Sequence, residues 1–219
     1  MFIAFIQANK DVLLSGLCAA IIVQGFVWLR EARQEQKTQK KEATYLAVRV
    51  TCILDEYVNK CVEVVQDDGT DNMGFPLHTD KGQEHYPPTV KLPDPPQFPN
   101  DVDWKSIDAD LMYRILTMPN TVNEANNYLK FIRSEYAHFP DYTEVHEARW
   151  GEYAKIGLEG IAIADVLRET YQLPDKDYTK RHDDWNPQGL FKEKIAIVEK
   201  RQKENEARAK ELDKELSCC

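Results

Sequence analysis

Two pairs of glutamate and histidine have spacings that occur in metal sites. Glu135 and His138 fit the Glu-x-x-His pattern of carboxylate-bridged metal centres in helical bundles. Those centres need a second such motif on a facing helix, and the sequence lacks one. His146 and Glu147 begin like a zinc-protease motif, but Trp150 stands where the second histidine is required. We therefore expect no metal-binding residues and no cofactor.

Nucleophilic side chains lack the neighbours that catalysis requires. None of the four serines stands in a Gly-x-Ser-x-Gly elbow, and no glycine-rich phosphate loop is present. Cys61 falls on the apolar stripe of its helix, which is typical of a small core residue, whereas Cys52 lies off it without an activating neighbour. The cluster His182-Asp183-Asp184 is interpreted as a solvated loop. The sequence therefore predicts no catalytic residues and a protein that is not an enzyme.

The chain ends in Cys218-Cys219, the one unusual short feature of the sequence. This ending resembles that of small GTPases that are doubly prenylated, and the resemblance stops at these two residues. Exposed terminal thiols near a membrane can be acylated, so Cys218 and Cys219 are candidate lipidation sites. Two unmodified thiols on a frayed helix end are the simpler interpretation. The five cysteines have irregular spacing and form no disulfide framework, which suits a reducing compartment.

An apolar run near the N-terminus predicts a transmembrane anchor. Residues 12–29 contain no charged side chain, and a helix needs about 20 apolar residues, with a lower limit near 17, to cross a bilayer core. A cleaved signal peptide would carry a shorter run followed by a small-x-small site, and a buried core helix is the remaining alternative. The residues that we expect to contact lipid are Val12, Leu13, Leu14, Leu17, Ile21, Ile22, Val23, Phe26, Val27, Trp28 and Leu29.

The basic residues that flank this run predict its orientation. Lys10 alone precedes the run, whereas five basic residues follow it closely: Arg30, Arg33, Lys37, Lys40 and Lys41. Short flanks rich in lysine and arginine stay on the cytoplasmic side. We therefore expect a short external N-terminus (1–11), an anchor (12–29), a basic juxtamembrane helix (30–41), and the bulk of this single-pass chain in the cytoplasm.

The charge balance bears on the partners of this cytoplasmic portion. The formal net charge is -9, and residues 1–41 carry six basic and three acidic side chains, so the remainder carries -12. An acidic protein repels nucleic acid and anionic membrane surfaces, except at the juxtamembrane basic cluster. We expect the lipid bilayer and other proteins as partners, and no nucleic acid.

The remaining sequence predicts an all-α fold. Apolar residues recur in steps of three and four from Glu42 to Gln66, and no proline or glycine interrupts residues 27–66, so the anchor is expected to continue into the domain as one helix. A proline-rich strap (67–103) holds seven of the eleven prolines and is expected to pack on the helices. Further helices are predicted over residues 104–117, 120–137, 141–172 and 187–217, with a break at Pro119.

Two features of the later helices predict packing. Gly157, Gly160 and Ala164 form a small-residue patch that we expect to admit a second backbone within the helical domain (42–189). The last, charged segment (190–219) keeps a weak heptad phase from Phe191 onward, typical of a poor coiled coil or of a solvated helix docked by its first turns. One hypothesis pairs this helix antiparallel with residues 30–66, which would bring Cys218 near Arg33.

These observations favour a single-pass, membrane-anchored helical protein. Its cytoplasmic domain is expected to act as a protein-interaction, tethering or regulatory module for membrane or cytoplasmic proteins, a second copy included. The alternative is a ligand-sensing helical module that signals through the anchor helix. An apolar pocket with convergent polar groups would favour sensing, whereas a solid core with an exposed apolar patch would favour protein binding.

Overall fold

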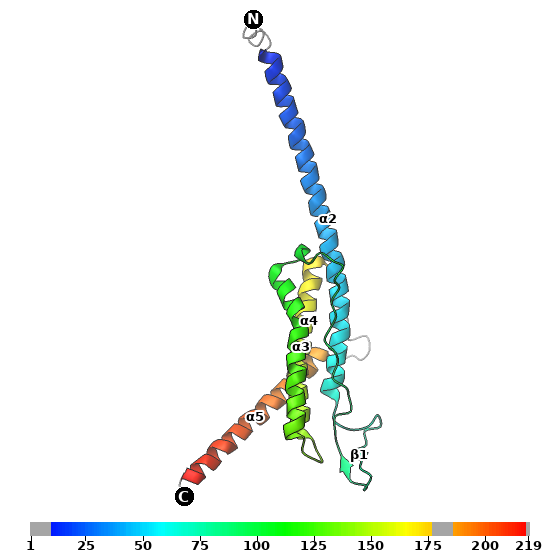
Figure 1. Ribbon diagram of the computed structural model, residues 1–219, viewed down its shortest axis with the longest axis vertical. Helices are drawn as coiled ribbons and strands as arrows, with labels where there is room; N and C mark the ends of the chain where they lie inside the picture. Colours follow the sequence, from blue (N-terminus) through cyan, green and yellow to red (C-terminus); the bar gives the residue numbers. More distant parts are fainter. Residues whose placement is uncertain (1–9, 177–185, 218–219) are drawn as a thin grey trace.

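The computed structural model describes residues 10–176 and 186–217, with the side chains of all of these except residues 10–23, 25, 212 and 215–217. The predicted all-α class is confirmed, because long helices make up most of these residues (Figure 1). A two-stranded antiparallel hairpin, which the sequence pattern did not reveal, is the exception. The elements are α2 (Lys10–Gln66), β1 (Leu77–His78), β2 (Glu84–His85), the short 3-10 helix η1 (Trp104–Ser106), α3 (Ala109–Tyr136), α4 (Thr143–Tyr171) and α5 (Pro187–Ser217).

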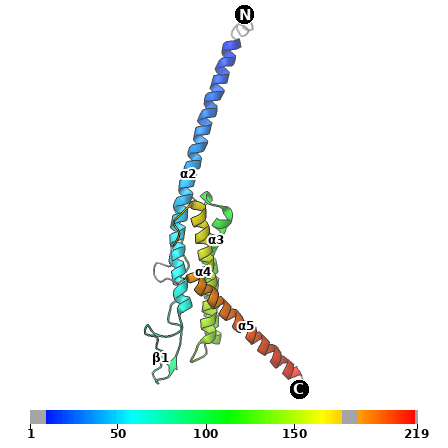
Figure 2. The same ribbon diagram turned by 180° about the vertical axis from the view of Figure 1, so that it is seen from behind.

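Helix α2 is a single helix of 57 residues, as the lack of internal breakers beyond residue 27 predicted. At 1.5 Å per residue it is about 86 Å long. From Ala43 onward one side of it is buried against the other helices, whereas residues 26–42 are exposed or half-buried and stand clear of the bundle (Figures 1 and 2). The first half of α2 is therefore an arm, and the second half is part of the core.

Helices α2, α3 and α4 lie side by side, and α4 contacts both of the others. Helices α2 and α3 run in the same direction, and α4 runs opposite to them (Figure 1). A parallel pair of helices requires a connection that returns along the bundle. Helix α3 has 28 residues and is about 42 Å long, so an extended strand of at least about 13 residues is needed. This geometry explains the long proline-rich strap between α2 and α3.

The strap lies along the bundle as an ordered segment. Val90, Leu92, Phe98 and Val102 are partly buried against the core, and the indole of Trp104 donates to the carbonyl of Pro99. Phe75, in the first half of the strap that we expected to pack on the helices, is 61% exposed. Apart from its first residues, the strap therefore packs mainly through its second half.

Helix α3 corrects the predicted break at Pro119. The helix continues through this proline from Ala109 to Tyr136 and is capped by Asp108, whose carboxylate accepts from the amides of Asp110 and Leu111. A proline inside a helix costs about 3 kcal/mol. Met118 and Val122 on either side of it are buried in the core, and this burial offsets the cost. Asp103 caps only the short η1, so the helix that we predicted from residue 104 begins later.

The predicted starts and ends of the last two helices agree closely with the structure. Helix α4 ends at Tyr171 with Gln172 in a left-handed conformation. The carboxamide oxygen of Asn186 accepts from the amide of Gln188, and Pro187 is the first residue of α5. This is the arrangement that a cap followed by proline predicts.

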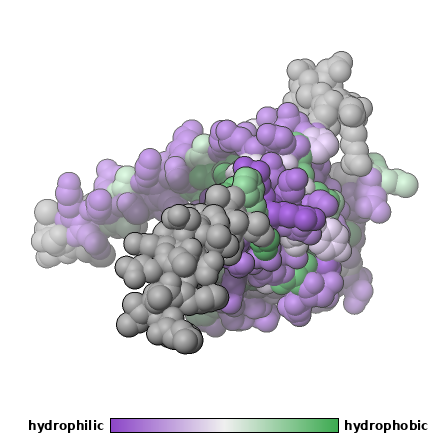
Figure 3. Space-filling model, turned by 90° about the horizontal axis from the view of Figure 1, so that it is seen from above, coloured by the Kyte–Doolittle hydropathy of each residue, from purple (hydrophilic) through white to green (hydrophobic). Residues whose placement is uncertain are grey.

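The predicted antiparallel pairing of α5 with α2 is wrong. Along α5, Phe191 packs at Gly157, Val198 lies near Gly151, and Arg201 pairs with Glu147. Helix α5 therefore runs antiparallel to α4, which itself runs opposite to α2. The end of α5 and the start of α2 lie at opposite ends of the molecule (Figure 1), and Figure 3 shows α5 extending sideways with a mostly hydrophilic surface. The structure removes the reason to place the C-terminus beside Arg33.

Candidate functional site

A buried ion pair fixes the strap at the end of α2. The Nη2 atom of Arg149 lies 2.8 Å from Oδ2 of Asp67, and both side chains are almost fully buried. The Asp67 carboxylate also accepts from the backbone amides of Thr89 and Val90, and Arg149 donates to the carbonyl of Val90. Burial alone would raise the pKa of Asp67, but these amides and Arg149 hold the pKa below its ordinary value. The strap and α4 are thus joined through one ionised pair.

Three further polar contacts hold the strap. The indole of Trp150 donates to the carbonyl of Asp67, and Nε2 of His146 donates to the carbonyl of Tyr86 at 2.8 Å. The amide nitrogen of Asn126 donates to Pro93, and its oxygen accepts from Tyr153 at 2.7 Å. Each of the long elements α3 and α4 therefore contributes a side chain that positions the strap.

A groove of about 550 Å³ lies between this strap and helices α3 and α4; we call it the strap groove. Strap residues 88–95 form one wall, and α3 and α4 form the other, with Val145 and Leu129 buried at its base. Its polar side chains are amides and bases, together with one hydroxyl and one acid; they are Asn123, Asn126, Asn127, Lys91, Lys130, Arg133, Arg149, Thr89 and Asp94. This chemistry is suited to holding an anion.

A second groove of about 560 Å³ lies on the other side of the strap, against α2. Its charged side chains are of both signs: Glu56, Lys60, Glu63, Lys91 and Asp94. The Lys60 ammonium pairs with Glu56 at 2.7 Å. Because these charges compensate one another, this groove favours no charge class of ligand.

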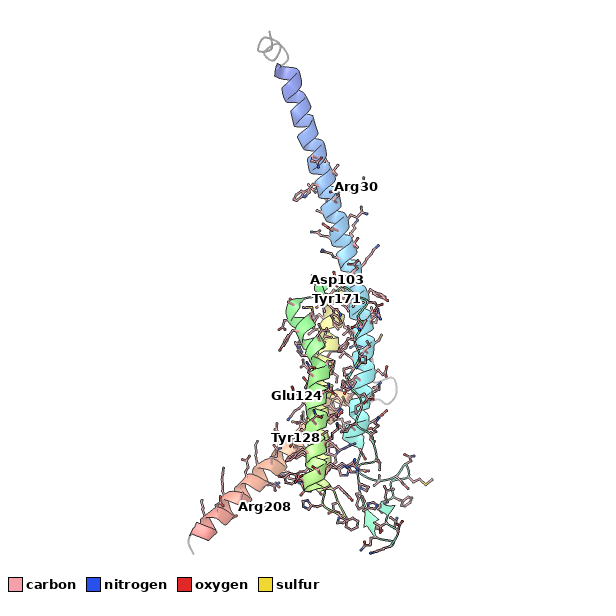
Figure 4. The ribbon with its side chains drawn as sticks, viewed as in Figure 1. Arg30, Asp103, Glu124, Tyr128, Tyr171 and Arg208 are labelled. Atoms are coloured by element: carbon pink, nitrogen blue, oxygen red, sulfur yellow. The ribbon has the colours of Figure 1, made fainter. Side chains whose placement is uncertain are left out.

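The outer side of α3 carries exposed apolar side chains, which we call the aromatic face: Tyr113, Leu116, Tyr128 and Phe131. Their exposed fractions are 67%, 44%, 47% and 53%. The ring of Tyr136 contacts that of Phe131 edge-on. Glu124 lies on the same side of α3 as Tyr128, away from α2 (Figure 4). Aromatic residues are enriched at protein interfaces, so this face is suited to a protein partner.

The predicted small-residue patch lies inside the bundle. All three of Gly157, Gly160 and Ala164 are buried. A Cβ atom on Gly157 would lie 2.4 Å from the Phe191 ring, and one on Gly160 would lie 3.2 Å from Val58. The nearest atoms at both glycines belong to side chains, so these glycines accommodate side chains of α5 and α2 rather than the second backbone that we expected.

The side chains of the predicted anchor fall mainly outside the description, which includes only Gln24 and residues 26–29 of that run. Phe26, Val27, Trp28 and Leu29 are all exposed. In the parts of the chain whose side chains are described, no helix is long and apolar enough to span a bilayer. The structure therefore adds no support for the anchor, which stays a prediction. The basic residues that follow it, Arg30, Arg33, Lys37, Lys40 and Lys41, are exposed along the free arm of α2.

The residues weighed for chemistry are dispersed. The imidazole of His138 lies 3.7 Å from Glu144 and not in a cluster with Glu135. The imidazole of His146 is hydrogen-bonded to the strap, at the carbonyl of Tyr86. Within the ranges 10–176 and 186–217, no group of three or more potential ligands could hold a metal ion. Cys61 is fully buried, and burial raises the pKa of its thiol. The cluster 182–184 and the candidate lipidation sites Cys218 and Cys219 are outside the described residues.

The Asp67–Arg149 pair was the main feature that sequence reasoning missed. In the sequence, Asp67 was interpreted only as the first residue of the proline-rich strap. The helical period carried a signal, since Arg149 lies four residues from both Val145 and Tyr153 on the core face of its helix. A basic residue on a core face requires a buried partner. Asp67 follows Val64 on the apolar stripe of α2 and could have been assigned that role.

Comparison with known proteins identifies no relatives: no protein-family model, curated protein or solved structure matches this chain.

Proposed function

We propose that this chain is a membrane-anchored interaction module. Residues 12–29 hold it in a bilayer, the arm of α2 carries the bundle away from the membrane surface, and the aromatic face of α3 binds a protein. The single observation that carries the proposal is this face, which gathers four large exposed side chains on the outer side of α3, a helix whose opposite side is packed into the core. An exposed apolar patch on a well-packed domain marks an interaction surface.

The chemistry of the aromatic face specifies the partner. Glu124 and Glu135 flank the exposed rings of Tyr128 and Phe131, and the whole chain is acidic. Complementary charge steers association and suppresses wrong partners. We therefore expect a partner surface with an apolar centre and basic residues at its rim, on a membrane or cytoplasmic protein.

The uncharged run and the continuity of α2 support the tether. Residues 12–29 carry no charge, five basic residues follow, and the backbone of α2 is helical throughout this stretch. From Arg30 to Gln66 the helix extends for about 55 Å. In this proposal, the start of α2 contacts lipid, and the bundle binds the protein partner.

The experiment is site-specific photo-crosslinking of the full chain in the membranes of its native cells. A photoreactive residue replaces Phe131 on the aromatic face, or Val166, which is 38% exposed on α4, as the matched control. We expect a discrete protein adduct from position 131 only, and its loss when Tyr128→Glu is added. The same adducts from both positions, or none from position 131, would contradict the proposal.

A second candidate function, ligand sensing, is favoured by the strap groove, where basic and amide side chains converge. A sensor that signals through α2 needs a ligand site that contacts α2. The strap groove is lined by the strap, α3 and α4, with no α2 residue in its lining. Protein binding is therefore the function that the arrangement supports better.

A further inference from the structure

The strap groove holds an excess of positive charge in an acidic protein. Four basic side chains line it against one acid, while the chain as a whole carries -9. Arg149 is neutralised by Asp67. The one acid, Asp94, faces the three remaining bases Lys91, Lys130 and Arg133, so at least two positive charges of the groove lining are not compensated within it. Within the described part of the chain, neither Lys130 nor Arg133 forms an ion pair.

Two guanidinium groups in the groove repel each other. Burial is the main cause that lowers the pKa of Arg149, and the positive charge of Arg133 lowers it further. Arg149 is 5% exposed, and its Nε atom has no hydrogen-bond partner within the described residues. Like charges held together and a buried donor without a partner are both costly, and both costs fall when an anion binds nearby.

The remaining groups of the groove define the ligand further. The side chain of Asn126 is held by Pro93 and Tyr153, whereas the side-chain amides of Asn123 and Asn127 form no hydrogen bond among the described residues. Two apolar residues at the base, Leu129 and Val145, are each 2% exposed. A volume of about 550 Å³ is within the range of small-molecule sites, which is roughly 300–1,000 Å³.

We propose that the strap groove binds a small organic anion. Its carboxylate or phosphate group lies between Lys130 and Arg133, and its apolar part lies over Leu129 and Val145. A guanidinium matches a carboxylate or phosphate with two parallel hydrogen bonds, which a lysine cannot do. The amides of Asn123 and Asn127 supply the neutral hydrogen bonds that orient the ligand.

The position of the groove favours a soluble anion over a lipid headgroup. Arg149 is joined to Asp67 at the far end of α2, about 55 Å along the helix from Arg30. If residues 12–29 lie in the bilayer, as the proposed function has it, the groove is too far from that membrane to reach its headgroups. This step alone rests on the proposed function; the groove chemistry does not.

The test measures binding of simple probes to the full chain in a non-ionic detergent by isothermal titration calorimetry. Phenyl phosphate and benzoate carry both parts of the proposed ligand, inorganic phosphate carries the charge alone, and benzyl alcohol carries the ring alone. We expect saturable binding of the two aromatic anions, weaker binding of inorganic phosphate and none of benzyl alcohol. An absence of saturable binding by either aromatic anion would overturn the proposal.

Matched variants locate the binding. Lys130→Gln with Arg133→Gln removes two charges from the groove, and Lys105→Gln with Lys155→Gln removes two exposed charges elsewhere. We expect about a tenfold or larger rise in Kd for phenyl phosphate with the first pair and no change with the second. Unfolding curves of both variants should match that of the wild type, since all four side chains are exposed. Equal losses of affinity from both pairs would refute the site.

A competition arm distinguishes the two sources of phosphate. Vesicles of phosphatidylcholine with phosphatidylglycerol are added to the complex with phenyl phosphate. We expect no displacement of the probe. Displacement by these vesicles, but not by pure phosphatidylcholine vesicles, would assign the groove to a lipid headgroup and overturn the soluble anion. Neither result bears on protein binding by the aromatic face of α3, which the crosslinking experiment tests separately.

Discussion

At the residue scale, the fold depends on polar contacts that join segments far apart in the sequence. Asp67 and Arg149 are 82 residues apart, and their ion pair is buried. Arg168 makes a second such contact, at 2.6 Å, with Asp55 of α2. The amphipathic period of each helix could be predicted, and with it most core positions, because burial follows the helical repeat. The pairing of Asp67 with Arg149 could not, since it depends on where the strap returns.

We predict that Arg149→Met lowers the free energy of unfolding by about 3–5 kcal/mol. The substitution leaves the Asp67 carboxylate buried without its cation, and breaking a buried pair in this way is strongly destabilising. Urea unfolding of the full chain in detergent measures the loss. The control is Arg49→Met, which breaks an exposed pair with Asp101 and should cost no more than about 1 kcal/mol. Equal costs in the two variants would show that the buried pair has no special role.

The Asp67 carboxyl also predicts a dependence of stability on pH. Its pKa in the folded chain is below the ordinary value, so its contribution is full above the unfolded pKa of about 3.9 and is lost as the pH falls through the folded pKa. The stability gap between the wild type and Asp67→Asn should therefore be constant near neutral pH and shrink below about pH 4. Urea unfolding across this range measures it; a gap that narrows between pH 7 and pH 5 instead would contradict the assignment.

Gly157 predicts how α5 is attached to the bundle. Phe191 occupies the space where a Cβ on Gly157 would lie, so Gly157→Ala should displace the ring and destabilise the fold by roughly 1–3 kcal/mol. Gly189→Ala, where nothing lies within 4 Å of the added carbon, should be neutral or stabilising by up to about 1 kcal/mol. Thermal unfolding compares the two. A neutral Gly157→Ala would mean that Phe191 does not dock there.

At the element scale, the starts of α4 and α5 could be predicted closely, whereas the start of α3 and its continuity through Pro119 could not. The start of α5 at residue 187 was predicted because the signal is local: the side chain of Asn186 bonds an amide two residues away. The continuity of α3 through Pro119 was missed because it depends on packing of α3 against α4, which no local pattern reveals. For the same reason the strap groove could not be predicted, since its walls come from three separate elements.

The proline inside α3 gives a prediction at this scale. Pro119→Ala restores a helical hydrogen bond and removes a steric clash, so it should stabilise the chain by about 1–3 kcal/mol. Pro187→Ala is the control, because a proline at the first helical position costs nothing in hydrogen bonds and should yield no gain. Denaturant unfolding measures both changes. A loss of stability in Pro119→Ala would mean that the bundle requires the local geometry that the proline imposes.

At the scale of the whole molecule, a long arm, a packed bundle and a diverging helix are joined in one chain. The arm of α2 and the far part of α5 lie at opposite ends (Figure 1). Arg208 is exposed on α5, far from Arg30 on the arm (Figure 4). The sequence predicted the arm from its unbroken helical stretch but gave the wrong direction for α5. That direction follows from the contacts of Phe191 with Gly157, Val198 with Gly151 and Arg201 with Glu147, and not from the heptad phase.

The central claim is that residues 12–29 tether this bundle to a membrane, and carbonate extraction tests it most directly. Membranes that contain the full chain are washed at high pH, and the chain is followed in the pellet and the supernatant. We predict that the uncleaved, full-length chain stays in the pellet, and that a variant with Ile21→Lys and Ile22→Lys is released, because two charges in the run make insertion costly. Release of the full-length wild-type chain into the supernatant would contradict the claim.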